Sequence, residues 1–197
     1  MVEIVVMMQL HRVGLSLAAL ALTASGALAQ QEAPRKPVTP TTIKTVGGWD
    51  VRCYPVQSLA PCEMWEAVAF KGTTQLAASL SIVYIPARDS YAVQIVLPFG
   101  MDFSKGARLA AGDYTSEVLH FERCERIGCL VAMRDGNGAA DALRGQAAVK
   151  VKVTWFHGKS MDITVPLKGY DEARSALVEA AKQKAAKPDA SAAAPSP

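Results

Sequence analysis

The four cysteines, Cys53, Cys62, Cys124 and Cys129, are the residues whose type and spacing offer the clearest chemistry. Cysteine thiolates either bind zinc or oxidise in pairs to disulfides. Structural zinc sites usually place about two to four residues between paired cysteines. Here eight residues separate Cys53 from Cys62, and four separate Cys124 from Cys129. The spacing therefore favours disulfides over a metal site. Four cysteines allow three pairings, and the residue types leave all three open at this point.

Two histidines and two glutamates are the remaining candidates for catalysis. His120 lies in an apolar setting typical of an exposed strand position, and His157 lies in a turn sequence. Glu122 and Glu125 could act as paired carboxylates, but arginines stand beside both, which favours surface ion pairs. The sequence contains no nucleophile elbow, zinc-protease motif, phosphate loop or dinucleotide fingerprint. We therefore expect no enzymatic activity, no cofactor and no bound metal.

The N-terminal segment indicates which compartment the protein enters. Arg12 is followed by an uncharged run over residues 13–31, and Ala27 and Ala29 are the small residues that a signal peptidase accepts. A membrane anchor is the alternative, but crossing a bilayer takes about 20 apolar residues. The apolar part of this run is shorter and is diluted by serine, threonine and glycine. We interpret residues 1–29 as a signal peptide and expect no transmembrane segment in the mature chain.

Alternating apolar and polar residues dominate the middle of the chain. This period of two is typical of antiparallel strands that have one buried face and one exposed face. Four such rows cover residues 76–84, 91–97, 149–155 and 161–167, and Leu119 with Phe121 indicates part of a fifth. Several strands at this spacing predict a mainly β fold, built as a sandwich or a barrel.

One helix is predicted at the C-terminal end of the folded domain. Gly169 ends the last strand, and Tyr170, Ala173 and Leu177 then recur at helical spacing. The flanking segments are rich in proline, threonine, alanine and lysine, and they lack the apolar side chains that would compensate for the entropy of ordering. We predict a flexible linker over residues 30–45, a folded domain over 46–183 and a disordered tail over 184–197.

Charge and aromatic residues bear on the kind of partner. The formal net charge of +3 is too mild for a nucleic-acid-binding surface, so no nucleic-acid partner is expected. Exposed aromatic residues on a sandwich can bind sugars or peptides, although most aromatic residues belong to a core. Trp155 ends an inward-facing row and is assigned to the core. Trp65, which closely follows Cys62, is the aromatic candidate for a contact surface.

Several short motifs follow one another along the chain: Gly48-Trp49-Asp50-Val51 before Cys53, Cys62-Glu63-Met64, Leu97-Pro98-Phe99-Gly100, Phe121 with Cys124, Gly128 and Cys129, and Gly169-Tyr170 before Ala173 and Leu177. Together they resemble the invasion-associated locus B family of Gram-negative bacteria. The resemblance implies an immunoglobulin-like antiparallel β-sandwich, secreted to the periplasm or the outer-membrane surface, with two local disulfides, Cys53–Cys62 and Cys124–Cys129. Two departures are visible. Tyr170 stands where the family often has Phe, and Trp65-Glu66 stands where Gln is common.

These features predict a non-enzymatic β-sandwich with a C-terminal helix. We expect it to be periplasmic or secreted, and association with the outer membrane is one form that this location can take. Because the chain consists largely of alternating strands and disulfides, loops and strand edges are left for recognition. We therefore expect binding to an unidentified protein or envelope component. An envelope structural or stress factor without a discrete ligand, and a hydrolase based on carboxylates, are the alternatives.

We predict that the exported protein begins at Gln30, because the peptidase would cut after Ala29. Mass spectrometry of the exported protein measures this whether translation starts at Met1, Met7 or Met8. A mature chain that retains residues 13–28 would contradict the signal peptide and support an anchor.

Overall fold

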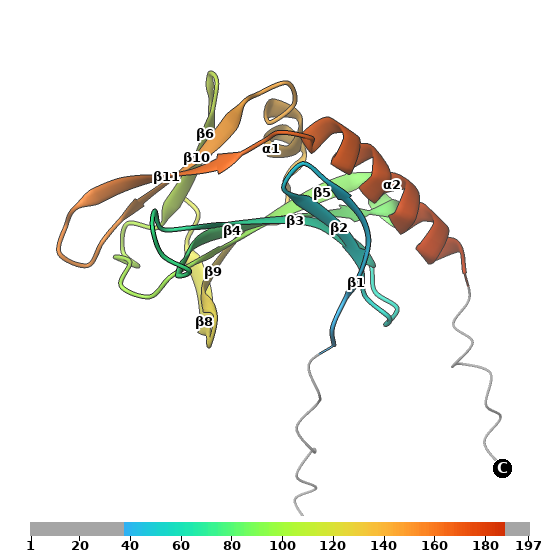
Figure 1. Cartoon of the computed structure of the whole chain (residues 1–197), viewed down its shortest axis with the longest axis horizontal. Coiled ribbons are helices and arrows are strands. Elements are labelled where there is room, and N and C mark those ends of the chain that lie inside the picture. Colours follow the sequence, from blue (N-terminus) through green and yellow to red (C-terminus); the bar gives the residue numbers. More distant parts are fainter. Residues whose placement is uncertain (1–37, 188–197) are drawn as a thin grey trace, which may run out of the picture. The chain divides into compact units, whose positions relative to one another are not determined.

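The computed structural model describes residues 38–187, whose strands form two antiparallel sheets (Figure 1). The strands are β1 (Thr41–Val46), β2 (Trp49–Cys53), β3 (Cys62–Ala69), β4 (Leu76–Ile85), β5 (Ser90–Leu97), β6 (Ala107–Ala111), β7 (Tyr114–Thr115), β8 (Phe121–Glu125), β9 (Gly128–Met133), β10 (Ala148–Thr154) and β11 (Ser160–Pro166). The seven-stranded sheet has the order β1-β2-β3-β4-β5-β9-β8, and the four-stranded sheet has the order β11-β10-β6-β7. The predicted mainly β sandwich is confirmed.

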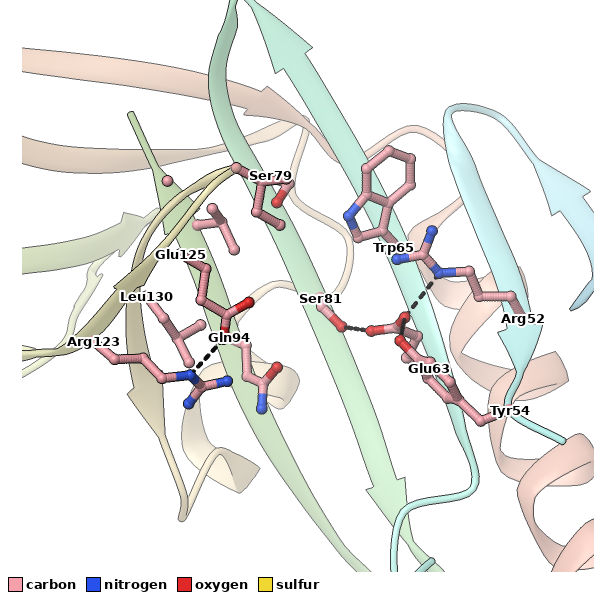
Figure 2. Close-up of a pocket in the computed structure, with 13 residues that line it drawn as sticks. Arg52, Tyr54, Glu63, Trp65, Ser79, Ser81, Gln94, Arg123, Glu125 and Leu130 are labelled. Atoms are coloured by element: carbon pink, nitrogen blue, oxygen red, sulfur yellow. Dashed lines mark hydrogen bonds and ion pairs between the residues drawn. The ribbon is translucent and has the colours of Figure 1, made fainter. Parts of the chain in front are cut away.

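The period of two in the sequence separates the two faces of each sheet. In β4, Leu80 and Ile82 are fully buried on the inner face, whereas Ser79 and Ser81 point to the outer face (Figure 2). The four alternating rows correspond to β4, β5, β10 and β11, and Phe121 begins β8. The turn sequence around His157 joins β10 to β11, which pair in register from Ala148↔Pro166 to Thr154↔Ser160.

Two helices complete the cover over the inner face of the seven-stranded sheet. They are α1 (Asn137–Ala142) and α2 (Tyr170–Ala186), and a short 3-10 turn spans Pro86–Arg88. Both helices and the four-stranded sheet lie on the same side of the seven-stranded sheet in Figure 1. The other side, called the outer face below, is not covered by any element in the described part of the chain. The hydrophobic core therefore lies between the seven-stranded sheet on one side and the four-stranded sheet with the two helices on the other.

The predicted C-terminal helix is α2, and local chemistry explains where it begins. Gly169 adopts a φ of 84°, a left-handed conformation that favours glycine, and so turns the chain out of β11. Asp171 and Glu172 then lie in the first helical turn, where the helix dipole favours negative charge. No helix among residues 38–187 is long and apolar enough to cross a membrane.

Trp49 and Tyr170 join the two ends of the folded domain. Both side chains are almost fully buried, and their rings meet edge to face with centroids 5.5 Å apart. The Tyr170 hydroxyl donates a hydrogen bond to the carbonyl oxygen of Ala140 in α1, at 2.8 Å. One tyrosine therefore links β2, α1 and α2.

The folded part is longer than predicted at both ends. β1 begins at Thr41, inside the segment predicted as linker, and α2 continues to Ala186, inside the segment predicted as tail. Most side chains of β1 are exposed, so the strand carries no alternating signal and depends on backbone pairing with β2 across the Gly47-Gly48 turn. The predicted signal peptide and residues 188–197 lie outside the described residues.

We predict that Trp49→Ala lowers the free energy of unfolding by about 3–5 kcal/mol, because it leaves a large cavity beside Tyr170. Trp65→Ala is the matched control, since Trp65 is partly exposed and should lose less. Urea unfolding of both variants measures the difference. Equal losses would show that the Trp49–Tyr170 contact does not hold the domain together.

Candidate functional site

The cysteines brace two hairpins of the seven-stranded sheet. Cys53 faces Cys62 across β2 and β3, with an S–S distance of 2.05 Å and a Cα–Cα distance of 4.0 Å. Cys124 faces Cys129 across β8 and β9, with corresponding distances of 2.07 Å and 3.9 Å. Each pair joins neighbouring strands, and none links the two sheets. A disulfide that closes a loop this short reduces the conformational entropy of the unfolded chain. In the chain-entropy model, each one stabilises the folded state by roughly 2–3 kcal/mol.

A groove of about 250 Å³ crosses the outer face between these two hairpins (Figure 2). Polar side chains from neighbouring strands line most of it, and a few aliphatic side chains form part of one wall. The residues are Arg52, Tyr54, Glu63, Trp65, Ser79, Ser81, Gln94, Val96, Arg123, Glu125, Ile127, Gly128 and Leu130. The groove lies on the outer face of the sheet, so the polar side chains in it that are exposed, Gln94, Arg123 and Glu125, are available to a partner.

Glu63 organises the end of the groove at β2 and β3. Its side chain is buried, with 5% of the residue exposed. Oε1 accepts hydrogen bonds from Arg52 Nε at 2.8 Å and from the Tyr54 hydroxyl at 2.5 Å, and Oε2 accepts one from the Ser81 hydroxyl. A buried carboxylate needs such partners because desolvation is costly. Burial, and then the hydrogen bond to Glu63, raises the pKa of Tyr54 to about 12, so the phenol remains a donor at neutral pH.

Arg52 is held in one orientation by two contacts. Nε binds Glu63, and the guanidinium lies 4.4 Å from the centroid of the Trp65 ring. A cation over an indole face is stabilised by the ring quadrupole. With Nε engaged, the two terminal nitrogens form a planar fork at the rim, a geometry that suits carboxylate and carbonyl oxygens. The Trp65 ring therefore supports the arginine and does not present that face to a ligand.

The other end of the groove carries a second guanidinium. Arg123 Nε donates to Glu125 Oε1 at 2.7 Å, and both side chains are more than half exposed. Gln94 projects from β5 between the two ends, and Leu130 lies beside it (Figure 2). Two arginines and two glutamates thus line the groove, so its charge is balanced and its hydrogen-bonding capacity is high.

The residues singled out from the sequence do not form one site. Trp65, the candidate contact residue, lies in the groove, whereas His157 stacks on Trp155 in the β10–β11 turn. Glu122 pairs with Arg134 at 3.0 Å, and Glu125 pairs with Arg123, as expected for surface ion pairs. Among residues 38–187, no three histidine, cysteine, aspartate or glutamate side chains cluster as a metal site requires.

Arg52, Glu63 and Ser81 were not identified from the sequence. Their positions carry a signal, because each alternates with a buried neighbour and so must point outward. The sequence gives no signal that these side chains lie close together, since this depends on the strand register that places Arg52 opposite Glu63 and Glu63 opposite Val83.

Glu66 is a second buried carboxyl, on the inner face of β3. The residue is 6% exposed, and neither its Oε2 nor the Nε1 of Trp49 has a hydrogen-bond partner among the described residues. A Cβ at Gly48 would lie 2.4 Å from Glu66 Oε1, so a larger residue there would displace the carboxyl group. Burial raises the pKa of Glu66 to about 7, from an ordinary value of 4.5. The carboxyl is therefore largely protonated below neutral pH.

Comparison with known proteins supports the family resemblance. The Invasion associated locus B (IalB) protein family matches residues 49–178. The crystal structure of invasion associated protein B from Bartonella henselae is similar, with a TM-score of 0.61 and 22% sequence identity. That match covers 71% of this chain and 97% of the Bartonella chain, and at this identity it shows the fold alone. No curated protein matches the chain.

We predict that Glu66→Gln changes the pH dependence of stability. Since the pKa of Glu66 is higher in the folded state than in the unfolded state, the folded state binds more protons between about pH 4.5 and 7. The free energy of unfolding of the wild type should therefore fall as pH rises through this window, by up to about 3 kcal/mol. The glutamine variant should lack this loss.

Urea unfolding at about pH 5 and about pH 8 measures the difference between the two proteins. Glu117→Gln, at an exposed glutamate, is the matched control and should follow the wild type. Parallel curves for wild type and Glu66→Gln would contradict the raised pKa.

Proposed function

Because the chain belongs to the invasion-associated locus B family, we propose that it is an exported, non-enzymatic protein that binds an envelope or macromolecular partner through the groove. The observation that carries this proposal is the oriented guanidinium of Arg52, held by Glu63 and by the Trp65 ring on an uncovered sheet face. Such a fork binds oxygen acceptors with little loss of side-chain entropy, because its orientation is already set.

The groove chemistry indicates what the partner presents. The fork of Arg52 and the amide of Gln94 both offer donors, and the serine hydroxyls at the centre are covered. A segment that presents carbonyl oxygens or a single carboxylate fits this arrangement better than a polyanion, because the nearby glutamates balance the arginines. Ile127 and Leu130 add apolar contact at the far wall.

The state of the carboxylates supports binding over hydrolysis. Both oxygens of Glu63 accept hydrogen bonds, and Glu125 is engaged by Arg123. A general base must be able to reach the proton that it removes. These contacts instead hold side chains in place, which suits recognition.

Export is supported by two independent features. The two disulfides are typical of proteins in an oxidising compartment, such as the periplasm or the extracellular space. The N-terminal sequence has the pattern of a secretory signal. Both features support a periplasmic or secreted location.

The test is retention of envelope proteins by the immobilised mature protein, from an extract in detergent so that membrane adsorption does not contribute. Trp65→Ala and Arg52→Lys are the informative variants. The lysine keeps a positive charge near Glu63 but loses the planar fork and its stacking. Arg88→Ala, at an exposed arginine outside the groove, is the matched control.

We expect the wild type and Arg88→Ala to retain the same protein, and both groove variants to retain at least tenfold less, the loss of about one well-placed charged hydrogen bond. Thermal unfolding of each variant checks that the fold is intact. Equal retention by all four proteins, or no specific retention by the wild type, would contradict the proposal and favour a structural role.

A further inference from the structure

Three loops meet at the end of the domain away from α2, on the left in Figure 1. They are residues 70–75 between β3 and β4, residues 98–106 between β5 and β6, and residues 155–159 between β10 and β11. Backbone hydrogen bonds join the second loop to the end of β10 and to the third loop, from Asp102 N to Thr154 O at 2.7 Å and from Phe156 N to Gly100 O at 2.9 Å. The first loop is joined through Phe70, which stacks on Trp155 with ring centroids 6.3 Å apart.

These loops carry five aromatic side chains, which we call the aromatic end: Phe70 and Trp155, which are partly buried against the core, and Phe99, Phe103 and Phe156, which are exposed. Phe156 is 74% exposed, Phe99 57% and Phe103 49%. Large apolar side chains gathered at one surface mark an interaction site in a soluble protein, whereas single ones do not.

The backbone holds these side chains in place. Gly100 has a φ of 95°, and a Cβ there would lie 2.9 Å from the Trp155 ring, so the loop next to Phe99 packs directly on the indole. Phe103 packs on Phe121 with centroids 4.6 Å apart. The phenylalanines are thus presented outward from a rigid base.

Each of the three loops also carries one lysine. They are Lys71, Lys105 and Lys159, and all three are exposed. Asp102 is the acidic residue in the loops, and its hydrogen bond with the Ser104 hydroxyl lowers the pKa of its carboxyl, so it stays charged. The balance at the aromatic end is therefore positive, in contrast to the groove.

We propose that the aromatic end docks the protein onto an anionic lipid surface, with Phe99, Phe103 and Phe156 entering the interface and the lysines contacting lipid phosphates. Aromatic side chains flanked by lysines suit the boundary between acyl chains and headgroups. The three side chains project from two loops, and a fluid interface can deform around such projections. A protein partner would have to offer a matching pocket for each one.

The test is co-sedimentation of the mature protein with vesicles of phosphatidylethanolamine and phosphatidylglycerol, compared with vesicles of phosphatidylcholine alone. We expect binding to the anionic vesicles that weakens with salt, because each lysine near the surface contributes about a fivefold gain. Phe156→Ser should lower the partition coefficient about tenfold, from the apolar area withheld from the interface.

Leu59→Ser is the matched control, since Leu59 is 67% exposed and lies in the β2–β3 loop, at the opposite end of β3 from residues 70–75. It should bind vesicles like the wild type, and Arg52→Lys should do the same, which separates this surface from the groove. Phe99→Ser provides a second variant if Phe156→Ser is unstable. The proposal would be overturned if the wild-type protein did not bind anionic vesicles, or if the serine variants bound them as well as the wild type does. Sedimentation velocity without lipid would overturn it as well if Phe156 proved to mediate a dimer.

Discussion

The packing of Trp49 against Tyr170 is the contact on which the rest of the fold depends. It joins the first hairpin of the domain to its last helix, two segments far apart in the sequence. The Tyr170 hydroxyl extends the link to α1, and Gly169 allows the chain to turn into α2 at the point where the ring must point inward. With α2 in place, the part of the inner face that the four-stranded sheet leaves open is buried. The seven-stranded sheet can then keep a polar outer face.

That polar outer face explains the unusual burial of charged groups there. Glu63 is nearly inaccessible although no element within residues 38–187 covers this face, because Arg52, Tyr54 and Ser81 surround its carboxylate. Removing one hydrogen-bond partner of a buried charged group lowers the free energy of unfolding by more than the hydrogen bond contributes, since the remaining charge stays desolvated. The contacts therefore hold Arg52 rigidly, and the two disulfides hold the hairpins at either end of the groove. The contacts that stabilise the buried Glu63 are therefore the same contacts that orient Arg52.

The groove and the aromatic end differ in chemistry as well as in place. The groove balances two arginines with two glutamates, whereas the aromatic end combines apolar side chains with lysines. A partner held by directed hydrogen bonds and a surface that accepts apolar side chains without fixed pockets are different kinds of target. The two proposed contacts are compatible in one small domain, because the groove lies on the outer face and the aromatic end lies at the loops.

Much of the architecture is determined by the sequence alone. Alternating residues identified β4, β5, β10 and β11 with their buried faces, Gly169 and the apolar stripe identified α2, and the motifs around the cysteines identified the family. These features are local: a strand's faces follow from a period of two and a helix from its stripe and its end. β1 escaped detection because its exposed side chains carry no pattern, and only pairing with β2 makes it a strand. The groove and the aromatic end were decided by the tertiary structure. Trp65 alone did not reveal that Arg52 and Glu63 would meet beside it, and no spacing placed Phe70 against Trp155. Such neighbours are set by strand order and register, which depend on the packing of the whole domain.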